Sequence, residues 1–177
     1  MIFDQENLLV RPLEESDASY LAKWLSDERV LEFYEGRDNP HDIKKIREVF
    51  YSKAEQINTC IVEYKSEPVG YLQFYPSTYD DKALYGYSNE EKLYGMDQFI
   101  GEPEYWNKGI GTKLVKGVSE YLLDSKIANI VSVDPQTRNE RAIRCYEKCG
   151  FKKVKLLPNQ ELHEGMMQDC WLMEYRK

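Results

Sequence analysis

The most constraining feature of the sequence is a strand pattern, a turn with two glycines and a helix pattern that follow one another directly. Residues 93–101 alternate like a strand, and residues 109–123 have the apolar period of a helix. The inward positions of that helix are Leu114, Val115, Val118, Tyr121 and Leu122. Gly109 and Gly111 allow a tight turn whose N–H groups approach a ligand closely, and Lys108 adds a positive charge. Because a helix N-terminus presents unpaired N–H groups, the segment predicts an anion-binding turn.

The rest of the chain alternates in the same way after an antiparallel start. Further strands are expected at 8–12, 57–64, 69–75, 130–133, 151–156 and 170–176. Three further helices are expected. The first opens at 14–17 and has Tyr20, Leu21, Trp24 and Leu25 as its apolar stripe. The second follows an Asn39 cap with Pro40 at its first position, and the third spans 141–149. Residues 76–92, polar and rich in tyrosine, read as a long loop. This pattern predicts an α/β (mixed α+β) fold.

Composition limits the classes of function. The 177 residues are expected to form a single domain over 1–177. No apolar run is long enough to cross a membrane, and the acidic N-terminal segment lacks the basic and apolar parts of a secretory signal, so we expect a cytoplasmic protein. The net charge of −7 disfavours free nucleic acid as a partner.

The charge is unevenly distributed along the chain. Residues 1–105 carry 22 acidic and 11 basic side chains, whereas residues 106–177 carry 9 acidic and 13 basic ones. The halves would suit a cationic and an anionic ligand respectively, although ordinary fluctuation of surface charge gives the same picture. The four cysteines include no CxxC pair, and only two histidines are present, so no metal site is expected and the thiols are expected to be reduced.

Spacing separates the possible kinds of anion turn. A Walker loop needs GxxxxGK[ST], but here Lys108 precedes the glycines. A dinucleotide fingerprint needs a third glycine where Leu114 stands. The segment Trp106-Asn107-Lys108-Gly109-Ile110-Gly111 instead resembles the pyrophosphate turn of GCN5-related N-acetyltransferases, Gln/Arg-x-x-Gly-x-Gly/Ala, with Trp106 at the Gln/Arg position.

A second motif strengthens the resemblance. Residues 139–151, NERAIRCYEKCGF, are similar to the same family's NxRAIxxYxKxGF signature. The resemblance implies the family's fold, a twisted mixed sheet splayed between its fourth and fifth strands, here 93–101 and 130–133, with flanking helices. It implies that acetyl-coenzyme A (with coenzyme A as product) binds in the gap. The residues that it assigns to the coenzyme are Phe99, Ile100, Asn107, Lys108, Gly109, Ile110, Gly111, Thr112, Asn139 and Ala142.

Within that family the chain resembles the aminoglycoside 6′-N-acetyltransferases, notably the acetyltransferase half of the bifunctional acetyltransferase–phosphotransferase. The similar stretches are 24–34, 94–103 and 161–165. They imply acetyl transfer to the 6′-amine of aminoglycoside antibiotics and hence resistance. The chain ends at Lys177, so no fused kinase domain is expected.

The chemistry assigns roles to three residues. Asp97 lies on the strand before the anion turn and would receive the proton of the acceptor amine, directly or through water, or mainly bind and orient it. Asp134, at the end of the next strand, would grip sugar amines, unless Asp134-Pro135 is only a turn. The signature places the Tyr146 hydroxyl beside the coenzyme sulfur, where it can protonate the thiolate; the alternative is helix packing. Catalytic roles are therefore expected for Asp97 and Tyr146.

Other readings stay open. The expected acceptor-site residues are Asp97, Asp134, Trp24, Tyr34 and Tyr75, although tyrosines also simply fill strands. Asn139 caps its helix, reaches the coenzyme arm, or does both. The acceptor could instead be a polyamine, a protein N-terminus or a siderophore hydroxylysine, and a coenzyme-binding sensor without catalysis is a further alternative.

Overall fold

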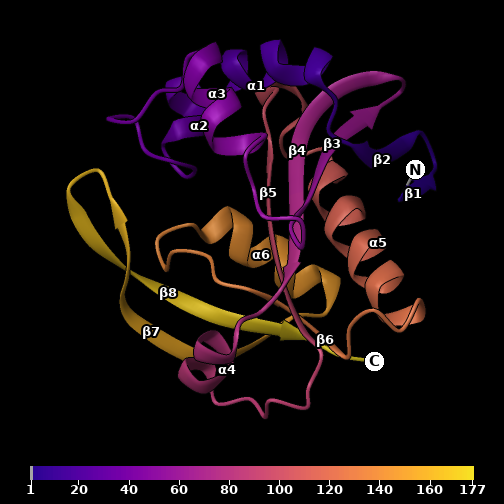
Figure 1. Cartoon of the computed structure of the whole chain (residues 1–177), viewed down its shortest axis with the longest axis vertical. Helices are drawn as coiled ribbons and strands as arrows, with labels where there is room; N and C mark the ends of the chain where they lie inside the picture. Colours follow the sequence, from indigo (N-terminus) through magenta and orange to yellow (C-terminus); the bar gives the residue numbers. More distant parts are fainter. Residues whose placement is uncertain (1) are drawn as a thin grey trace. The chain divides into compact units, whose positions relative to one another are not determined.

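The computed structural model describes residues 2–177, which form two compact units. Of the described residues, the first unit comprises 2–73 and 98–111, and the second comprises 74–97 and 112–177. Neighbouring strands are hydrogen bonded in the order β1-β2-β3-β4-β5-β6-β8-β7 (Figure 1). The strands are β1 (Phe3–Gln5), β2 (Leu8–Pro12), β3 (Asn58–Tyr64), β4 (Glu67–Pro76), β5 (Leu93–Ile100), β6 (Ile130–Val133), β7 (Lys152–His163) and β8 (Met166–Tyr175). The α-helices are α1 (Ala18–Trp24), α2 (Glu28–Leu31), α3 (Ile43–Phe50), α4 (Tyr79–Tyr85), α5 (Ile110–Asp124) and α6 (Glu140–Cys149).

The first unit contains the antiparallel strands β1, β2 and β3 and three short helices. Figure 1 shows α1, α2 and α3 clustered together. Their apolar faces meet in one core with Ile61 and Tyr71, and Trp24, Leu25 and Ile46 there have no exposed surface. Burial of such side chains contributes roughly 1.5–3 kcal/mol each. Beside this core, Arg11 forms a two-pronged ion pair with the buried Asp17, with N–O distances of 2.7 and 2.8 Å.

One prediction for this unit was confirmed and one was wrong. The predicted helix start at 14–17 is present as a 3₁₀ turn, Glu15–Asp17, with Glu14 as its N-cap, and the turn leads directly into α1. The predicted Asn39 cap is replaced by Asp42, whose side chain accepts from the Lys45 N–H over 2.8 Å. Asp is as good a cap as Asn, and the helix starts where the apolar period of Ile46 and Phe50 begins.

The second unit is a mixed sheet with the long β7–β8 hairpin at its edge (Figure 1). β6 pairs with β5 in parallel and with β8 antiparallel. The parallel ladder has only three pairs, and it ends at Gly95 opposite Ser132 while β5 continues to Ile100. These strands are the predicted fourth and fifth strands, moved up by one because β1 was not expected, so the predicted splay is confirmed.

The predicted loop at 76–92 contains the helix α4, so that prediction was wrong. Thr78 and Asp81 form a capping box: the Thr78 hydroxyl accepts from the Asp81 N–H, and the Asp81 carboxylate accepts from the Thr78 N–H. None of the helical residues is fully buried, which explains why no apolar period marks the helix in the sequence. The helix ends at Gly86, whose φ of 86° is left-handed.

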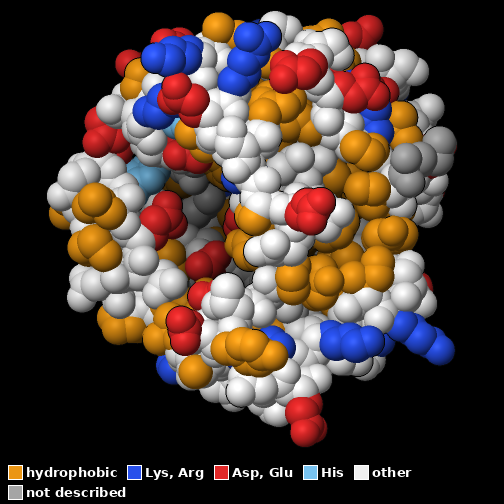
Figure 2. Space-filling view, in the orientation of Figure 1, with side chains coloured by type: hydrophobic (Ala, Val, Ile, Leu, Met, Phe, Trp, Pro, Cys, Tyr) orange, Lys and Arg blue, Asp and Glu red, His pale blue; other side chains and the backbone are white. Residues whose placement is uncertain are grey.

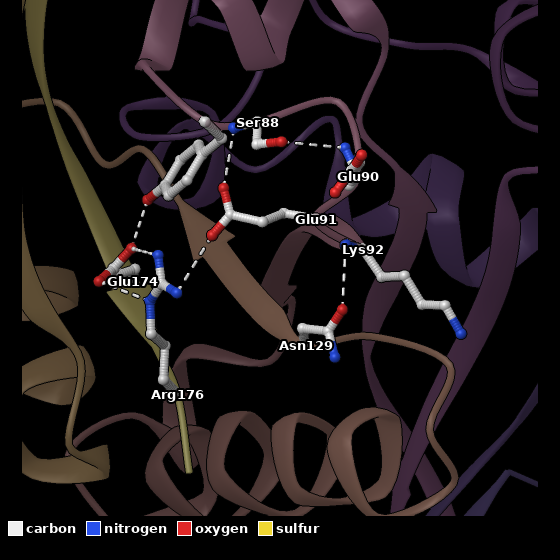
Figure 3. A network of polar contacts seen from close by, with 8 residues as sticks. Ser88, Glu90, Glu91, Lys92, Asn129, Glu174 and Arg176 are labelled. Atoms are coloured by element: carbon white, nitrogen blue, oxygen red, sulfur yellow. Dashed lines mark hydrogen bonds and ion pairs between the residues drawn. The ribbon is translucent and has the colours of Figure 1, made fainter.

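Polar contacts tie the segment after α4 to β8 (Figure 3). The Tyr87 hydroxyl donates to Glu174 Oε2 over 2.5 Å, and Arg176 bonds both Glu174 and Glu91. The Glu91 carboxylate also accepts from the Ser88 N–H over 2.8 Å. These bonds fix the connection that leads from α4 into β5.

Hydrophobic side chains remain exposed near the tip of the β7–β8 hairpin, which Figure 2 shows as orange spheres over that tip. Leu162 is 68% exposed and Met166 67% exposed. Among residues 2–177, no helix has the length and apolar character needed to cross a membrane.

Candidate active site

An acidic pocket opens in the second unit, lined by residues of β4, α4, β5, β6 and β8. Tyr75 from β4, Asp81 and Tyr85 from α4, Gly95 from β5, and Ser132 and Asp134 from β6 or its end contribute to its lining. Strands β5 and β6 separate beyond their last pair, Gly95 opposite Ser132. The pocket thus places two carboxylates and two phenol rings around one space.

Asp97 is joined to this pocket through Tyr75. The Tyr75 hydroxyl donates a hydrogen bond to Asp97 Oδ2 over 3.0 Å. A Cβ atom at Gly95 would lie 2.7 Å from the Tyr75 ring, so only glycine leaves room for the ring in this position. The absence of a side chain at Gly95 therefore allows the Tyr75 ring to lie where its hydroxyl reaches Asp97.

Asp134 has the electrostatics of a group that exchanges protons at neutral pH. Burial raises its pKa to about 7, and the negative charges of Asp97 and Glu161 add to the effect. Low dielectric disfavours an ionised carboxylate, and a second carboxylate nearby disfavours it further. Asp97 and Asp134, predicted separately from the sequence, are thus brought into one electrostatic unit.

The pocket tyrosines are protonated donors. Burial, together with the charges of Asp97 and Asp134, raises the pKa of both Tyr75 and Tyr85 above the ordinary phenol value. Each ring therefore presents an O–H group and an apolar face to the space between the carboxylates.

Tyr146 lies on the inward face of α6. It is 9% exposed, and its ring packs against Phe151 with centroids 5.8 Å apart. Burial raises the pKa of its hydroxyl, with contributions from Cys145, Asp97 and Asp134. The Tyr146 hydroxyl therefore stays protonated, in the electrostatic field of the two aspartates.

The anion turn has the backbone conformation that the glycines predict. Asn107 and Gly109 are left-handed, with φ of 59° and 80°. Nothing lies within 4 Å of a Cβ built at Gly109, so glycine serves conformation rather than space there. Alternation of left-handed residues before a helix directs N–H groups to one point, where α5 begins at Ile110. The turn therefore fits a pyrophosphate, for which Asn107 through Thr112 would supply N–H groups.

Trp106 has a structural role where the family usually has Gln or Arg. Its indole Nε1 donates to the Ile100 carbonyl over 2.7 Å and so closes the loop between β5 and the turn. Lys108 extends its ammonium over the Tyr105 ring, 5.5 Å from the centroid. Trp106 thus supplies a hydrogen bond that holds the loop, in place of the usual Gln or Arg side chain, and the backbone amides of the turn remain.

Asn139 caps α6, one of the two roles left open by the sequence. Its side chain accepts a hydrogen bond from the Ala142 N–H over 3.2 Å. Asn139 and Ala142, both assigned to the coenzyme by resemblance, therefore form the first turn of the helix that carries Tyr146.

The remaining predicted residues form an aromatic group in the first unit. Phe99, which precedes Ile100 at the end of β5, packs against Tyr34 at 4.6 Å and against Trp24 at 6.1 Å. Trp24 has no exposed surface, and its Nε1 donates to Glu102 over 2.9 Å. The prediction that Trp24 contacts the acceptor needs correction here, because a fully buried ring can only support Phe99, against which Tyr34 packs.

Sequence analysis missed Asp81, and it considered Tyr85 for stacking on sugar rings without assigning it to the site, because residues 76–92 were interpreted as a loop. The Thr78-x-x-Asp81 spacing is a capping-box signal that predicts a helix start and would have placed both residues on one element. Among residues 2–177, no group of three or more His, Cys, Asp or Glu side chains is arranged to hold a metal ion.

The fold and the turn have known counterparts. The family described as acetyltransferase (GNAT) domain matches residues 14–158. An aminoglycoside N(6′)-acetyltransferase type 1 from Klebsiella pneumoniae is 28% identical over 151 residues, which cover 84% of this chain and 75% of that protein. The solved structure of aminoglycoside acetyltransferase AAC(6′)-Ib with coenzyme A and kanamycin is similar at 26% identity and a TM-score of 0.75, over 96% of this chain and 95% of that one. A GNAT-family acetyltransferase from Bacillus anthracis shares the fold at 17% identity, with a TM-score of 0.80 over 98% and 97% of the two chains.

The family match spans the parting strands β5 and β6, the turn before α5 and the Asn139-capped α6. These are the parts on which the resemblance of the sequence depended. The chain therefore belongs to the GNAT family and is an acetyl-coenzyme-A-dependent N-acetyltransferase.

Proposed function

We propose that this enzyme acetylates the 6′-amine of aminoglycoside antibiotics and thereby confers resistance to them. The observation that carries the proposal is the pocket in which Asp81 and Asp134 lie beside the Tyr75–Asp97 pair. Aminoglycosides carry several ammonium groups on sugar rings, so their recognition requires carboxylates that can each take a charge-assisted hydrogen bond. The similarity to aminoglycoside N(6′)-acetyltransferases supports the same class of acceptor.

The aromatic residues complete the complementarity to an aminosugar. Tyr75 and Tyr85 offer ring faces to the apolar faces of a sugar and to its ammonium groups. Their hydroxyls remain protonated and can donate to sugar oxygens.

Asp97 and Asp134 together handle the proton of the amine. An ammonium cannot attack a carbonyl carbon, so one proton must leave the acceptor nitrogen before the C–N bond forms. Asp97 receives this proton, directly or through water, and Asp134, with a pKa near 7, shares it at neutral pH. Tyr75 holds the Asp97 carboxylate in the orientation that this transfer needs.

Tyr146 acts at the other end of the reaction. When bound, acetyl-coenzyme A would supply the activated acetyl thioester, and the turn from Asn107 to Thr112 would hold its pyrophosphate. The departing sulfur needs a proton when the C–S bond breaks, and the protonated Tyr146 hydroxyl provides it. The proton taken up at the aspartates and the one given by Tyr146 balance over the cycle through solvent.

A comparison of two related acceptors tests the position of transfer. Kanamycin A has an amine at the 6′ position and paromomycin has a hydroxyl there. We expect acetylated kanamycin A, with NMR locating the new amide at the 6′ nitrogen, and much slower turnover of paromomycin. Equal turnover of both, or an amide at another ring position, would refute the 6′ assignment.

A further inference from the structure

Two thiols that the acetyl-transfer chemistry does not use meet at the start of α5. Cys145 and Cys149 lie four residues apart on α6, so they share one face of that helix. Thr112 Oγ1 lies 3.6 Å from Cys145 Sγ, and Cys149 Sγ donates to the Thr112 carbonyl over 3.3 Å. Thr112 thus holds both thiols against the first turn of α5.

Cys145 differs from the other three cysteines in access. It is partly exposed, whereas Cys60 and Cys170 have no exposed surface and Cys149 is 4% exposed. All four are free thiols. Cys145 is therefore the most accessible of the four cysteines to a reagent in solution.

The surroundings of Cys145 also favour its thiolate. The polar groups of Cys149 and Thr112 beside its sulfur and the positive charge of Lys148 together lower its pKa to about 7. Burial raises the pKa of both Cys60 and Cys170 to about 12. Reactivity with disulfides follows the thiolate, so accessibility and ionisation select the same residue.

We propose that Cys145 is a covalent modification site for low-molecular-weight disulfides, and that its modification blocks the coenzyme site. The proposal rests on the family's coenzyme turn and on the assignment of Thr112 to it. A group attached to Cys145 would lie against Thr112, in the first turn of α5, where N–H groups are needed for the pyrophosphate.

The reaction is a thiol–disulfide exchange. The Cys145 thiolate attacks one sulfur of a disulfide R–S–S–R, a Cys145–S–S–R bond forms, and RS⁻ leaves and takes a proton from solvent. Cys145 is oxidised and the disulfide reagent is reduced. Cys149 would have to lose its proton to displace R; this residue is 4% exposed, and burial raises the pKa of its thiol, so the mixed disulfide persists.

The test uses the native enzyme and the aromatic disulfide 5,5′-dithiobis(2-nitrobenzoate). We expect one thiol per chain to react before denaturation, with peptide mass mapping placing the adduct on Cys145. Prior addition of acetyl-coenzyme A should protect that thiol. Coenzyme affinity, measured by calorimetry, should fall at least about ten-fold on modification, as loss of the pyrophosphate contacts implies, and should recover with dithiothreitol.

Two variants serve as controls. Cys145→Ser should take no label and should keep its coenzyme affinity in the presence of the reagent. Cys149→Ala removes one hydrogen-bond donor, so labelling of Cys145 should continue but shift to higher pH. A native Cys145 that stays unlabelled, or an adduct that leaves coenzyme affinity unchanged, would overturn the proposal. Coenzyme affinity of the unmodified enzyme is measured first, so a failure of the coenzyme site itself would appear separately.

Discussion

The Tyr75 hydroxyl donates a hydrogen bond of 3.0 Å to Asp97 Oδ2 across neighbouring strands, and the missing side chain at Gly95 makes this bond possible. The pair connects the acidic pocket with the carboxylate that we assign to the acceptor amine. From the sequence alone, Asp97 could be a solvent-facing strand residue; the bond from Tyr75 fixes the orientation of its carboxylate.

Tyr75→Phe removes this hydrogen bond and keeps the ring. A hydrogen bond to a charged group contributes about 1.5–3 kcal/mol, so kcat/KM for an aminoglycoside should fall at least about ten-fold. The KM for acetyl-coenzyme A should stay the same. Tyr87→Phe is the matched control, because Tyr87 donates to Glu174 outside the pocket. Equal effects of the two variants would show that the Tyr75–Asp97 bond has no special part in turnover.

Gly95→Ala should act through Tyr75. The new methyl group would lie 2.7 Å from the ring and would displace it, so the Asp97 bond should be lost. Because both changes break one interaction, the double variant with Tyr75→Phe should lose little more than the worse single variant. Steady-state kinetics of the three variants measure this coupling. Fully additive losses would mean that Gly95 acts by another route.

Asp134→Asn should change the pH dependence of stability. The folded pKa of Asp134 is about 7, above its unfolded value, so the folded state holds a proton between about pH 4 and 7. Stability therefore falls as pH rises through this range, and the burial penalty is complete above pH 7. The variant should be about 1–3 kcal/mol more stable than wild type at pH 8 and equal to it near pH 4. Urea unfolding at the two pH values measures this, with the exposed Asp80→Asn as control. An unchanged difference between pH 4 and pH 8 would contradict the raised pKa.

Gly101→Ala should destabilise the first unit without touching the acidic pocket. A Cβ atom there would lie 2.2 Å from Trp24, whose ring is fully buried and cannot yield. Overpacking of this kind costs about 1–3 kcal/mol. The measurement is the urea midpoint of the purified variant. A midpoint equal to that of wild type would show that the Trp24 packing is looser than the structure has it.

Tyr146→Phe should slow acetyl transfer and leave the KM for the aminoglycoside nearly unchanged. Loss of a general acid lowers kcat by about 100-fold or more. Tyr175→Phe removes a hydroxyl from the ring on the other side of Phe151 and serves as control. If kcat stays at the wild-type value, Tyr146 is only a packing residue.

Local signals in the sequence predicted the parts of the fold that depend on local physics. The bounds of β6 were predicted to the residue, because four apolar or small residues between turns make a buried strand. A cap was one of the two roles that the sequence allowed for Asn139, because its side chain needs only the N–H three residues ahead. The turn at Gly109 was predictable because its left-handed backbone conformation is one that glycine adopts readily.

Parts that depend on tertiary contacts were not predictable. α4 has no apolar period, since its residues are not fully buried, and Asp81 and Tyr85 reach the pocket only through the fold. Trp24 lies in a helical stripe from which neither full burial nor the Glu102 bond can be read. The joining of Tyr75 to Asp97 depends on the pairing of two strands that are separated by a helix.

The most direct test of the central claim is release of free thiol from acetyl-coenzyme A with kanamycin A, spermidine or a short peptide as acceptor. The account predicts rapid release with kanamycin A, little with the other two, and a large loss with kanamycin A in Asp97→Ala while coenzyme affinity is retained. Release with spermidine or the peptide alone would contradict the aminoglycoside assignment, and wild-type turnover in Asp97→Ala would contradict the role of Asp97.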